Sequence, residues 1–271
     1  MKKTVEEFFK KEKIEYYSVL DYSFCRENRK YLLEREKLEA KSVIMFLVPY
    51  YTGETENLSR YAASYDYHIF IGDITGRLCR ELSEKHPEYK FIGYGDHSPI
   101  DERYAALSAG LGIAGDNGLL INEKYGTYVF IVDVISDVPP EKLGAKAPLE
   151  VKRCIGCGAC RLACPTGILA GEGNDCLSAI TQRKGELLPE EIKLMREYNT
   201  VWGCDECQSC CPYNKNPEMT PISFFYKNNI KSLDRKTLDS MDESEFKKRA
   251  FAWRGRKTVE RNIDAVYGKG F

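Results

Sequence analysis

The sequence predicts an α+β protein: a mixed α/β part of about 150 residues, then a small cysteine-rich domain and a short helical tail. Three observations predict this class. A continuous apolar run at residues 43–48 ends at Pro49, which is typical of a buried strand. Helix-like segments then alternate with further strand-like runs. All of the 11 cysteines except Cys25 and Cys79 fall between residues 154 and 211.

Three more strand-like runs follow the first, at residues 90–94, 119–121 and 128–132. The last two flank a turn-like stretch at residues 122–126. With helices between them, this order favours a mixed sheet flanked by helices.

Two helices are predicted between these strands. Ser98 is the expected cap of the second, with Pro99 as its first residue, Asp101 as the capping-box carboxylate and an end at Gly110 or Gly112. The first has apolar residues at four-residue spacing. They are Phe70, Ile74, Leu78 and Leu82.

The cysteines form two runs that end in Cys-Pro. The runs read Cys154-x2-Cys157-x2-Cys160-x3-Cys164-Pro165 and Cys204-x2-Cys207-x3-Cys211-Pro212. A cubane iron–sulfur cluster needs four converging thiolates, and in two-cluster ferredoxins the cysteine before proline ligates the other cluster. The spacing therefore predicts two 4Fe–4S clusters in a ferredoxin-like domain.

Two cubanes need eight ligands, and Cys176 is the natural addition to the seven in the runs. The predicted ligands of one cluster are Cys154, Cys157, Cys160 and Cys211. Those of the other are Cys164, Cys176, Cys204 and Cys207. Cys210 is an alternative to Cys211, and Cys25 and Cys79 are expected to be buried, inert thiols.

Other uses of these cysteines fit less well. A disulfide scaffold is typical of short secreted chains, and residues 1–7 run straight into acidic residues without a signal-peptide core. Structural zinc favours two separate Cys-x2-Cys pairs, although thiolates bind zinc well. The longest apolar run is far short of a membrane span, so we expect a soluble, cytoplasmic protein. We also expect a monomer.

Charge is balanced at −1, which argues against polyanion binding by bulk charge. We expect domains at residues 1–150, 151–220 and 221–271, with a helix at 188–198 inside the second.

The stretch 247–271 is basic. Its apolar residues favour a helical tail that docks on the body over a nucleic-acid patch. They are Phe246, Ala250, Trp253 and Ile263.

Several segments match one family along nearly the whole chain. They are Ser59-Arg60-Tyr61-Ala62 with Asp66-Tyr67-His68, Asp96-His97-Ser98-Pro99-Ile100, the glycine-rich stretch 109–117, and the cysteine runs with the isolated Cys176. In these the chain resembles the epoxyqueuosine reductases, cobalamin-dependent iron–sulfur enzymes of tRNA modification. It looks like a short form that lacks the helical-repeat extension of many members.

The resemblance implies a nitroreductase-like N-terminal domain that holds a corrinoid, and clusters that deliver single electrons from an unidentified low-potential donor. The substrate would be an epoxide on a modified base in a tRNA anticodon, reduced to an alkene with loss of water. Asp96 matches the family's proton donor, with a helix-entry role as the alternative. Asn117 would contact the corrinoid, with a turn residue before Gly118 as the alternative. Arg60 and Tyr61 would contact a corrinoid amide or a tRNA phosphate, or else cap the helix that follows.

Two other functions remain open. One is a two-cluster ferredoxin-like electron carrier whose α/β domain only docks a partner. The other is a related corrinoid or flavin reductase that acts on a small molecule. In the tRNA reading, basic residues of the tail would contact phosphates. They are Lys247, Lys248, Arg254 and Arg256.

Overall fold

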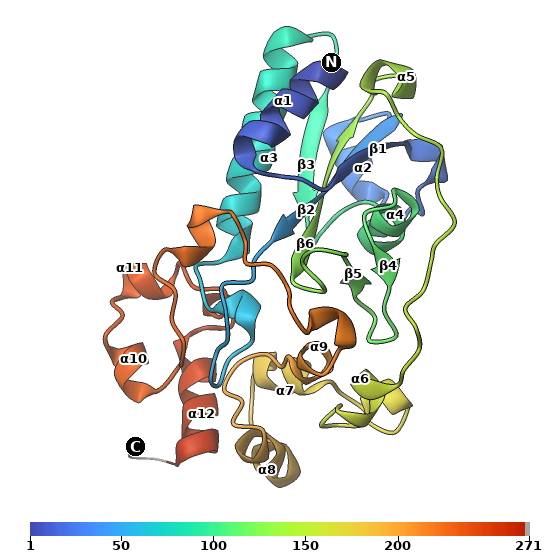
Figure 1. Ribbon diagram of the computed structural model, residues 1–271. Helices are drawn as coiled ribbons and strands as arrows, with labels where there is room; N and C mark the ends of the chain where they lie inside the picture. Colours follow the sequence, from blue (N-terminus) through green and yellow to red (C-terminus); the bar gives the residue numbers. More distant parts are fainter. Residues whose placement is uncertain (269–271) are drawn as a thin grey trace. The chain divides into compact units, whose positions relative to one another are not determined.

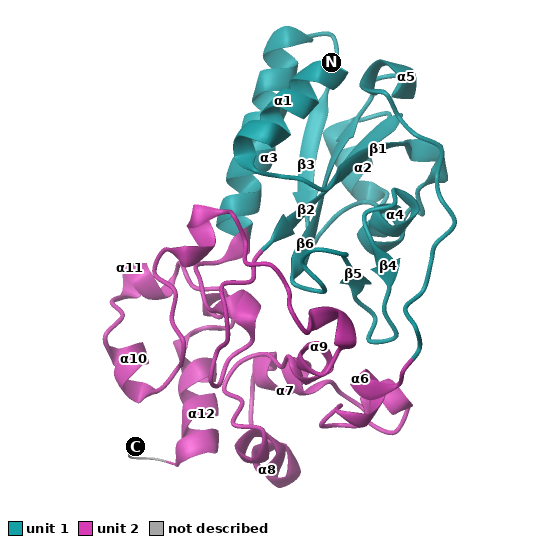
Figure 2. Cartoon of the chain, in the orientation of Figure 1, with its two compact units in different colours: residues 1–49, 68–156 teal, residues 50–67, 157–271 magenta. Residues whose placement is uncertain are grey.

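A computed structural model describes residues 1–268, and the chain divides into two compact units (Figure 2). Unit 1 consists of Met1–Pro49 and His68–Gly156, and unit 2 of Tyr50–Tyr67 and the chain from Cys157 onward. The functional domains at 1–150, 151–220 and 221–271 stay a prediction. The end of the predicted tail, residues 269–271, lies outside the described residues.

The centre of unit 1 is a four-stranded sheet in the order β1-β2-β6-β3 (Figure 1). Its strands are β1 (Tyr17–Asp21), β2 (Ser42–Pro49), β6 (Val129–Ser136) and β3 (Phe91–Gly95). Every residue of β2 is buried, because the strand is apolar and has a hydrogen-bonded neighbour on each side.

The α+β class and the strands predicted at 43–48, 90–94 and 128–132 are confirmed, the last reaching Ser136. The expectation of a mixed sheet is wrong, since all three pairings are antiparallel. β2 and β3 do run in the same direction, as a crossover through a helix requires, but β6 lies between them. The run at 119–121 gives β5 (Leu120–Ile121), which pairs with β4 (Ile113–Ala114) and not with β6.

Helices cover both faces of this sheet (Figure 1). On one face lie α1 (Lys2–Glu12) and α3 (Tyr67–Lys85), with the rings of Phe9 and Phe46 4.9 Å apart. On the other lie α2 (Tyr31–Glu36) and α4 (Glu102–Ser108). The predicted helix between the first two strands is confirmed as α3, and the short α5 (Pro140–Leu143) follows β6.

The start of α4 differs from the prediction. Asp101 caps the helix, and its Oδ1 accepts the N–H of Tyr104 at 2.9 Å. Ser98 instead accepts the N–H of Ile100. The reason is that the chain up to Asp101 is held extended by hydrogen bonds to the backbone of residues 26–29, so the helix starts later.

Unit 2 is built from short helices around an apolar core that includes Trp202, Phe251 and Ile263. The predicted helix at 188–198 is confirmed as α8, whose Glu191 accepts the N–H of Leu188 at 2.8 Å. The helices are α6 (Ala159–Leu162), α7 (Leu177–Gln182), α8 (Pro189–Glu197), α9 (Glu206–Ser209), α10 (Arg235–Asp239), α11 (Glu243–Phe246) and α12 (Arg256–Tyr267).

The tail packs as expected through Phe246, Ala250 and Ile263, all buried in the core of unit 2. Trp253 does not join them and is 57% exposed. Within residues 1–268, no helix is both long enough and apolar enough to cross a membrane.

Candidate functional site

The cysteine runs lie on short helices and the loops between them. Cys160 lies in α6, Cys207 lies in α9, and Cys176 is the cap residue of α7. All 11 cysteines are thiols outside any disulfide, as metal ligands need to be. Burial raises the pKa of Cys25 and of Cys79 to about 12, which suits the inert role expected for both.

Four of the predicted ligands gather in one part of unit 2. Burial raises the pKa of Cys204 and of Cys207 to about 12, and the charge of Cys176 acts in the same direction on both. Tyr198 lies beside Cys204 and Cys164: burial raises its pKa, and the charges of both cysteines add to that effect. Cys164, Cys176, Cys204 and Cys207 therefore share one neighbourhood.

The loop after Cys164 directs backbone N–H groups at its sulfur. Burial raises the pKa of this thiol, but the N–H groups of Leu169, Thr166 and Ile168 outweigh burial and lower the pKa below its usual value. The Oγ1 of Thr166 is 3.7 Å from the same sulfur. These donors favour the thiolate, which is the form that binds iron.

A second gathering involves α6 and α9, which pack together. Burial raises the pKa of Cys210, and the charges of Cys160 and Cys211 act in the same direction. Cys157 is exposed on the loop before α6. Cys154 belongs to unit 1, where its N–H donates to the Ala114 carbonyl at 2.9 Å.

The donor set fits two cubanes. Within the described residues, no three His, Cys, Asp or Glu side chains converge on a single metal ion. A cubane places each thiolate on a different iron, so its four sulfurs stand further apart than the ligands of one ion. The pairing of each cysteine with a cluster stays a prediction, and Cys210, the alternative to Cys211, is the one on which the charge of Cys160 acts.

Asp205, between Cys204 and Cys207, is the anchor of the second run. Its carboxylate accepts hydrogen bonds from Ser59 Oγ at 2.6 Å, from the backbone N–H of Arg60 at 2.7 Å and from the Arg60 guanidinium at 3.1 Å. The guanidinium also binds Glu54 and Ser209 Oγ. The segment 59–60 therefore fixes the cysteine run in place.

The predicted cofactor contacts Arg60 and Tyr61 both belong to this part of unit 2. The side chain of Arg60 is 9% exposed in its pair with Asp205. The Tyr61 hydroxyl accepts a hydrogen bond from Trp202 Nε1 at 3.0 Å. Both side chains have these structural partners, and their contact with a cofactor stays a prediction.

Asp96 lies directly after β3 with φ 67°, in the left-handed region that only a few non-glycine residues adopt. Its backbone N–H donates to Glu102 Oε1 at 3.0 Å. Its side chain is 66% exposed, and its Oδ2 is 3.9 Å from Nε2 of His68. Asp96 is thus not the helix cap, which is Asp101, but it does lie in the turn ahead of α4, and its catalytic role stays a prediction.

Two acidic residues behind Asp96 were not predicted. Burial raises the pKa of Glu102 to about 7, and the charge of Asp96 adds to this effect. Asp133, in the middle of β6, is completely buried, which raises its pKa well above the usual value. A sequence signal existed, because Asp133 interrupts an otherwise apolar run at residues 129–135.

Asn117 lies in the turn between β4 and β5. Its Oδ1 accepts the N–H of Leu119 at 3.2 Å, and Gly118 between them has φ 82°. Asp116, in the same turn, pairs with Arg153 at 3.4 Å. The Gly118 carbonyl accepts a hydrogen bond from Arg103, and the contact of Asn117 with a corrinoid stays a prediction.

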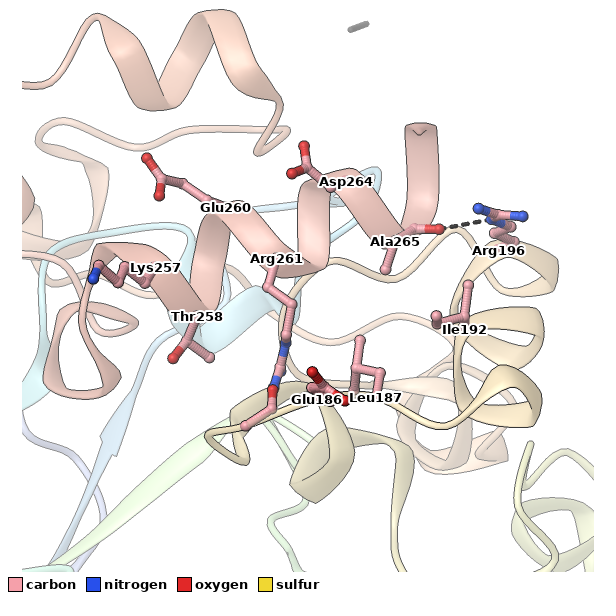
Figure 3. A pocket seen from close by; sticks show the side chains of 11 residues that line it. Glu186, Leu187, Ile192, Arg196, Lys257, Thr258, Glu260, Arg261, Asp264 and Ala265 are labelled. Atoms are coloured by element: carbon pink, nitrogen blue, oxygen red, sulfur yellow. Dashed lines mark hydrogen bonds between the residues drawn. The ribbon is translucent and has the colours of Figure 1, made fainter. Parts of the chain in front are cut away.

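Unit 2 also has an open pocket of about 700 Å³ between α8 and α12 (Figure 3). Its polar groups hold the two helices and the loop before α8 together: Arg196 donates to the Ala265 carbonyl at 2.7 Å, and Arg261 donates to the carbonyls of Arg183 and Gly185. It contains none of the predicted site residues, and we assign no ligand to it.

Known protein families match two parts of the chain. Residues 153–214 match the family described as a 4Fe-4S double cluster binding domain. Residues 34–96 match the family described as epoxyqueuosine reductase QueG, DUF1730. The first match contains all eight predicted ligands, and the second ends at Asp96.

Curated relatives carry the same description. The epoxyqueuosine reductase of Leadbetterella byssophila is 34% identical over 242 residues, which cover 84% of this chain and 77% of the relative. That of Aliivibrio fischeri is 33% identical over 196 residues, covering 70% and 52%. That of Bacillus subtilis is 32% identical over 211 residues, covering 73% and 52%. The chain thus spans about half the length of the last two.

Solved structures show the same fold. The structure of epoxyqueuosine reductase from Streptococcus thermophilus has a TM-score of 0.75 at 22% identity, over 98% of this chain and 80% of that one. A crystal structure of epoxyqueuosine reductase with an epoxyqueuosine-modified tRNA stem loop has a TM-score of 0.78 at 24% identity, over 97% and 80%.

Proposed function

Because the chain belongs to the epoxyqueuosine reductase family, we propose that it is an oxidoreductase that uses two 4Fe–4S clusters and a cobalamin to reduce epoxyqueuosine to queuosine in tRNA. The observation that carries this proposal is the gathering of Cys164, Cys176, Cys204 and Cys207, which brings the isolated cysteine to the runs. The names of the relatives support the substrate.

We assign the clusters to the two predicted ligand sets and the corrinoid to the polar turn around Asn117. When bound, the clusters supply single electrons and the corrinoid supplies a strongly reducing cobalt centre. The protein contributes position and charge. Asp205 holds the second cysteine run, and the N–H groups around Cys164 stabilise its thiolate.

Asp96 is the proposed catalytic acid. Reduction of an epoxide to an alkene and water consumes two electrons and two protons, and the departing oxygen must be protonated. The hydrogen bond to Glu102 holds the left-handed backbone of Asp96, and the side chain is 66% exposed, so a substrate can reach it.

For Arg60 and Tyr61 we propose contacts to the corrinoid or to a tRNA phosphate, in addition to their hydrogen bonds inside unit 2. Among the basic residues of the tail, Lys247 and Lys248 are exposed and suited to phosphate contact. Arg256 is less suited, because its guanidinium donates to the carbonyls of Leu238 and Met241. We place the protein in the cytoplasm as a monomer, supplied by a low-potential electron donor.

The test of the function has two stages. The full chain is reconstituted anaerobically with iron and sulfide and titrated with cob(II)alamin, with binding followed by electron paramagnetic resonance. A stoichiometric signal without axial nitrogen coupling is expected. The loaded protein is then given epoxyqueuosine-containing tRNA and a chemical reductant, and the nucleosides are analysed by mass spectrometry. Clusters without corrinoid binding would support an electron carrier instead.

We predict that Asp96→Asn lowers turnover by about 10²-fold or more while clusters and corrinoid stay bound, because the amide cannot donate the proton. The measurement is single-turnover formation of queuosine. Asp73→Asn is the matched control: it removes a carboxylate of unit 1 that is 60% exposed and pairs with Arg77 on α3. Equal turnover in the two variants would remove Asp96 from the mechanism.

A further inference from the structure

Three carboxyl groups of unit 1 lead from the surface to the interior. The side chain of Asp96 is 66% exposed, Glu102 is partly buried, and Asp133 is completely buried. They come from three different elements: the end of β3, the first turn of α4 and the middle of β6. The reaction proposed above uses only the outermost of them.

The first two groups are connected by a hydrogen bond. Glu102 Oε1 accepts the backbone N–H of Asp96 at 3.0 Å. This bond holds a residue whose φ of 67° is unfavourable for a side chain other than glycine. Oε1 is thus used as an acceptor, and Oε2 is left to carry a proton.

The innermost group has no countercharge. Asp133 lies opposite Met45 and Tyr94 in the sheet, and within the described part of the chain neither of its oxygens has a partner in hydrogen-bond geometry. Its neighbours from the surrounding elements are neutral or acidic. They are Tyr22, Cys25, Tyr94, Ser98 and Glu102. Burial and the charge of Glu102 raise the pKa of Asp133 well above its usual value and outweigh the nearby Ser98 hydroxyl, which acts in the opposite direction, so the protonated form is favoured.

The middle group, Glu102, has a pKa close to neutral pH. Burial raises the pKa of Glu102 to about 7, and the charges of Asp96 and Asp101 act in the same direction. The N–H of Asp96 and the guanidinium of Arg29 act against them. At neutral pH, Glu102 is therefore present in both its protonated and its ionised form.

The reaction needs two protons, and a single carboxyl group delivers only one at a time. We propose that Glu102 holds the second proton of this site and passes it through water to the Asp96 carboxylate. In this step the O–H bond of Glu102 breaks and one forms on Asp96, and Glu102 regains its proton from solvent. Asp96 is the catalytic residue and Glu102 the residue that positions and reloads it. This inference rests on the proposed function.

Its first test needs no substrate. Infrared spectra of the reconstituted full chain are recorded from pH 5 to 9, and the carboxyl band lost in Glu102→Gln is assigned to Glu102. We expect a midpoint near pH 7. Asp96→Asn should lower this midpoint, because it removes a negative charge that favours the protonated form. A midpoint near that of an ordinary glutamate, unmoved by Asp96→Asn, would overturn the proposal.

Asp133→Asn is the matched control. Asp133 is already neutral, so its replacement by a neutral residue of similar shape should leave the Glu102 midpoint in place. A midpoint that falls in this variant as far as in Asp96→Asn would show that Asp133 is ionised, and would overturn the proposed order of the three groups.

The second test measures turnover against pH. Glu102→Gln keeps an oxygen that accepts the Asp96 N–H, so the loop is held, but the amide cannot donate an acidic proton. Turnover should fall by about 10-fold or more, and the pH profile should lose its limb near 7, with partial recovery in Glu102→Asp. An unchanged pH profile in Glu102→Gln contradicts the inference. If the protein shows the expected infrared titration but does not reduce epoxyqueuosine, the proposed function is wrong. The coupling between the carboxyl groups of Glu102 and Asp96 is then still supported.

Discussion

The thiol of Cys164 differs from those of Cys204 and Cys207 in the number of backbone N–H groups directed at it. Three N–H groups lower its pKa, whereas burial raises that of Cys204 and Cys207 to about 12. Thiolates at the latter two positions are unfavourable until positive iron compensates them. Cluster assembly should therefore release protons, and Cys164 is the ligand best prepared to bind iron first.

We predict that Cys176→Ala loses one of the two clusters, so that bound iron falls from about eight atoms per chain to about four. The measurement is iron and labile sulfide per chain, with electron paramagnetic resonance of the reduced protein. Cys210→Ala is the control, since the predicted ligand sets contain Cys211 and not Cys210, so both clusters should survive. Full occupancy in Cys176→Ala would show that another group is the eighth ligand.

At this scale, the sequence predicts what depends on short spacing. The cysteine runs can be interpreted because a cubane fixes the distances between neighbouring ligands. Glu102 and Asp133 could not be paired, because they are 31 positions apart in the numbering and meet only through the sheet register. Arg60 was predicted as a cofactor contact without its partner Asp205, which lies 145 residues away.

At the scale of elements, the turn at Ser59 and the start of α9 form one buried junction. Gly203, with φ 73°, lies against Ser59, and an added Cβ would overlap with the Cβ of that serine. Asp205 then accepts hydrogen bonds from both residues 59 and 60. The second cysteine run thus depends on a segment of unit 2 that comes from far earlier in the chain.

We predict that Asp205→Ala destabilises unit 2 by about 3–5 kcal/mol, because it leaves the buried guanidinium of Arg60 with less compensation. Chemical unfolding should be followed together with the cluster absorbance, which should be lost at lower denaturant. Ser209→Ala removes one hydrogen bond from the same guanidinium and should cost only about 1 kcal/mol. Similar losses in both variants would contradict a special role for Asp205.

A second junction joins β3 to α3. A Cβ added to Gly93 would overlap with the side chain of Thr75, so Gly93→Ala should destabilise the protein by about 1–3 kcal/mol. Gly76→Ala, one residue along the same helix, meets nothing within 4 Å and should stabilise by about 0.5–1 kcal/mol. Thermal unfolding of the pair measures both; a stable Gly93→Ala would mean that the helix can move away from the strand.

The predicted bounds of a helix were wrong where hydrogen bonds from a distant part of the backbone hold the chain extended. The helix expected from Ser98 begins later, because residues 98–101 bond to the segment 26–29. β1 and α1 were not predicted, since the strand Tyr17–Asp21 has polar residues at both ends and pairs with only one neighbour. The strand at 43–48 was predictable because its own residues are apolar and all are buried. The strand at 90–94 was predictable from its aromatic and β-branched residues, although only Phe91 is buried.

For the whole molecule, the buried acid of β6 gives stability a dependence on pH. Asp133 has its pKa raised on folding, so the folded state binds a proton that the unfolded chain has lost above its ordinary pKa near 4. Stability from this group is therefore full at acid pH and decreases as pH rises toward the folded-state pKa. Glu102 acts in the same sense up to its own pKa of about 7.

We predict that Asp133→Asn gains stability relative to the parent protein as pH rises from 5.5 to 8.5, because asparagine has no proton to lose. Thermal unfolding midpoints of both proteins across this range give the difference. Glu123→Gln removes a carboxylate of unit 1 that accepts a hydrogen bond from Tyr16 near the surface. Its difference from the parent should change less with pH; a flat difference for Asp133→Asn would mean that this acid is ionised in the folded protein.

The interrupted course of the chain also affects how the protein is made. Residues 50–67 leave the ribosome between two stretches of unit 1, yet Ser59 bonds to Asp205, which is translated 146 residues later. At about 5–20 residues per second this is a wait of about 7–30 s. During that time the segment is linked at both ends to unit 1, while the rest of its own unit is still being made. A single protease cut near residue 156 would likewise not separate unit 1 from residues 50–67, because that segment is covalently linked to both stretches of unit 1.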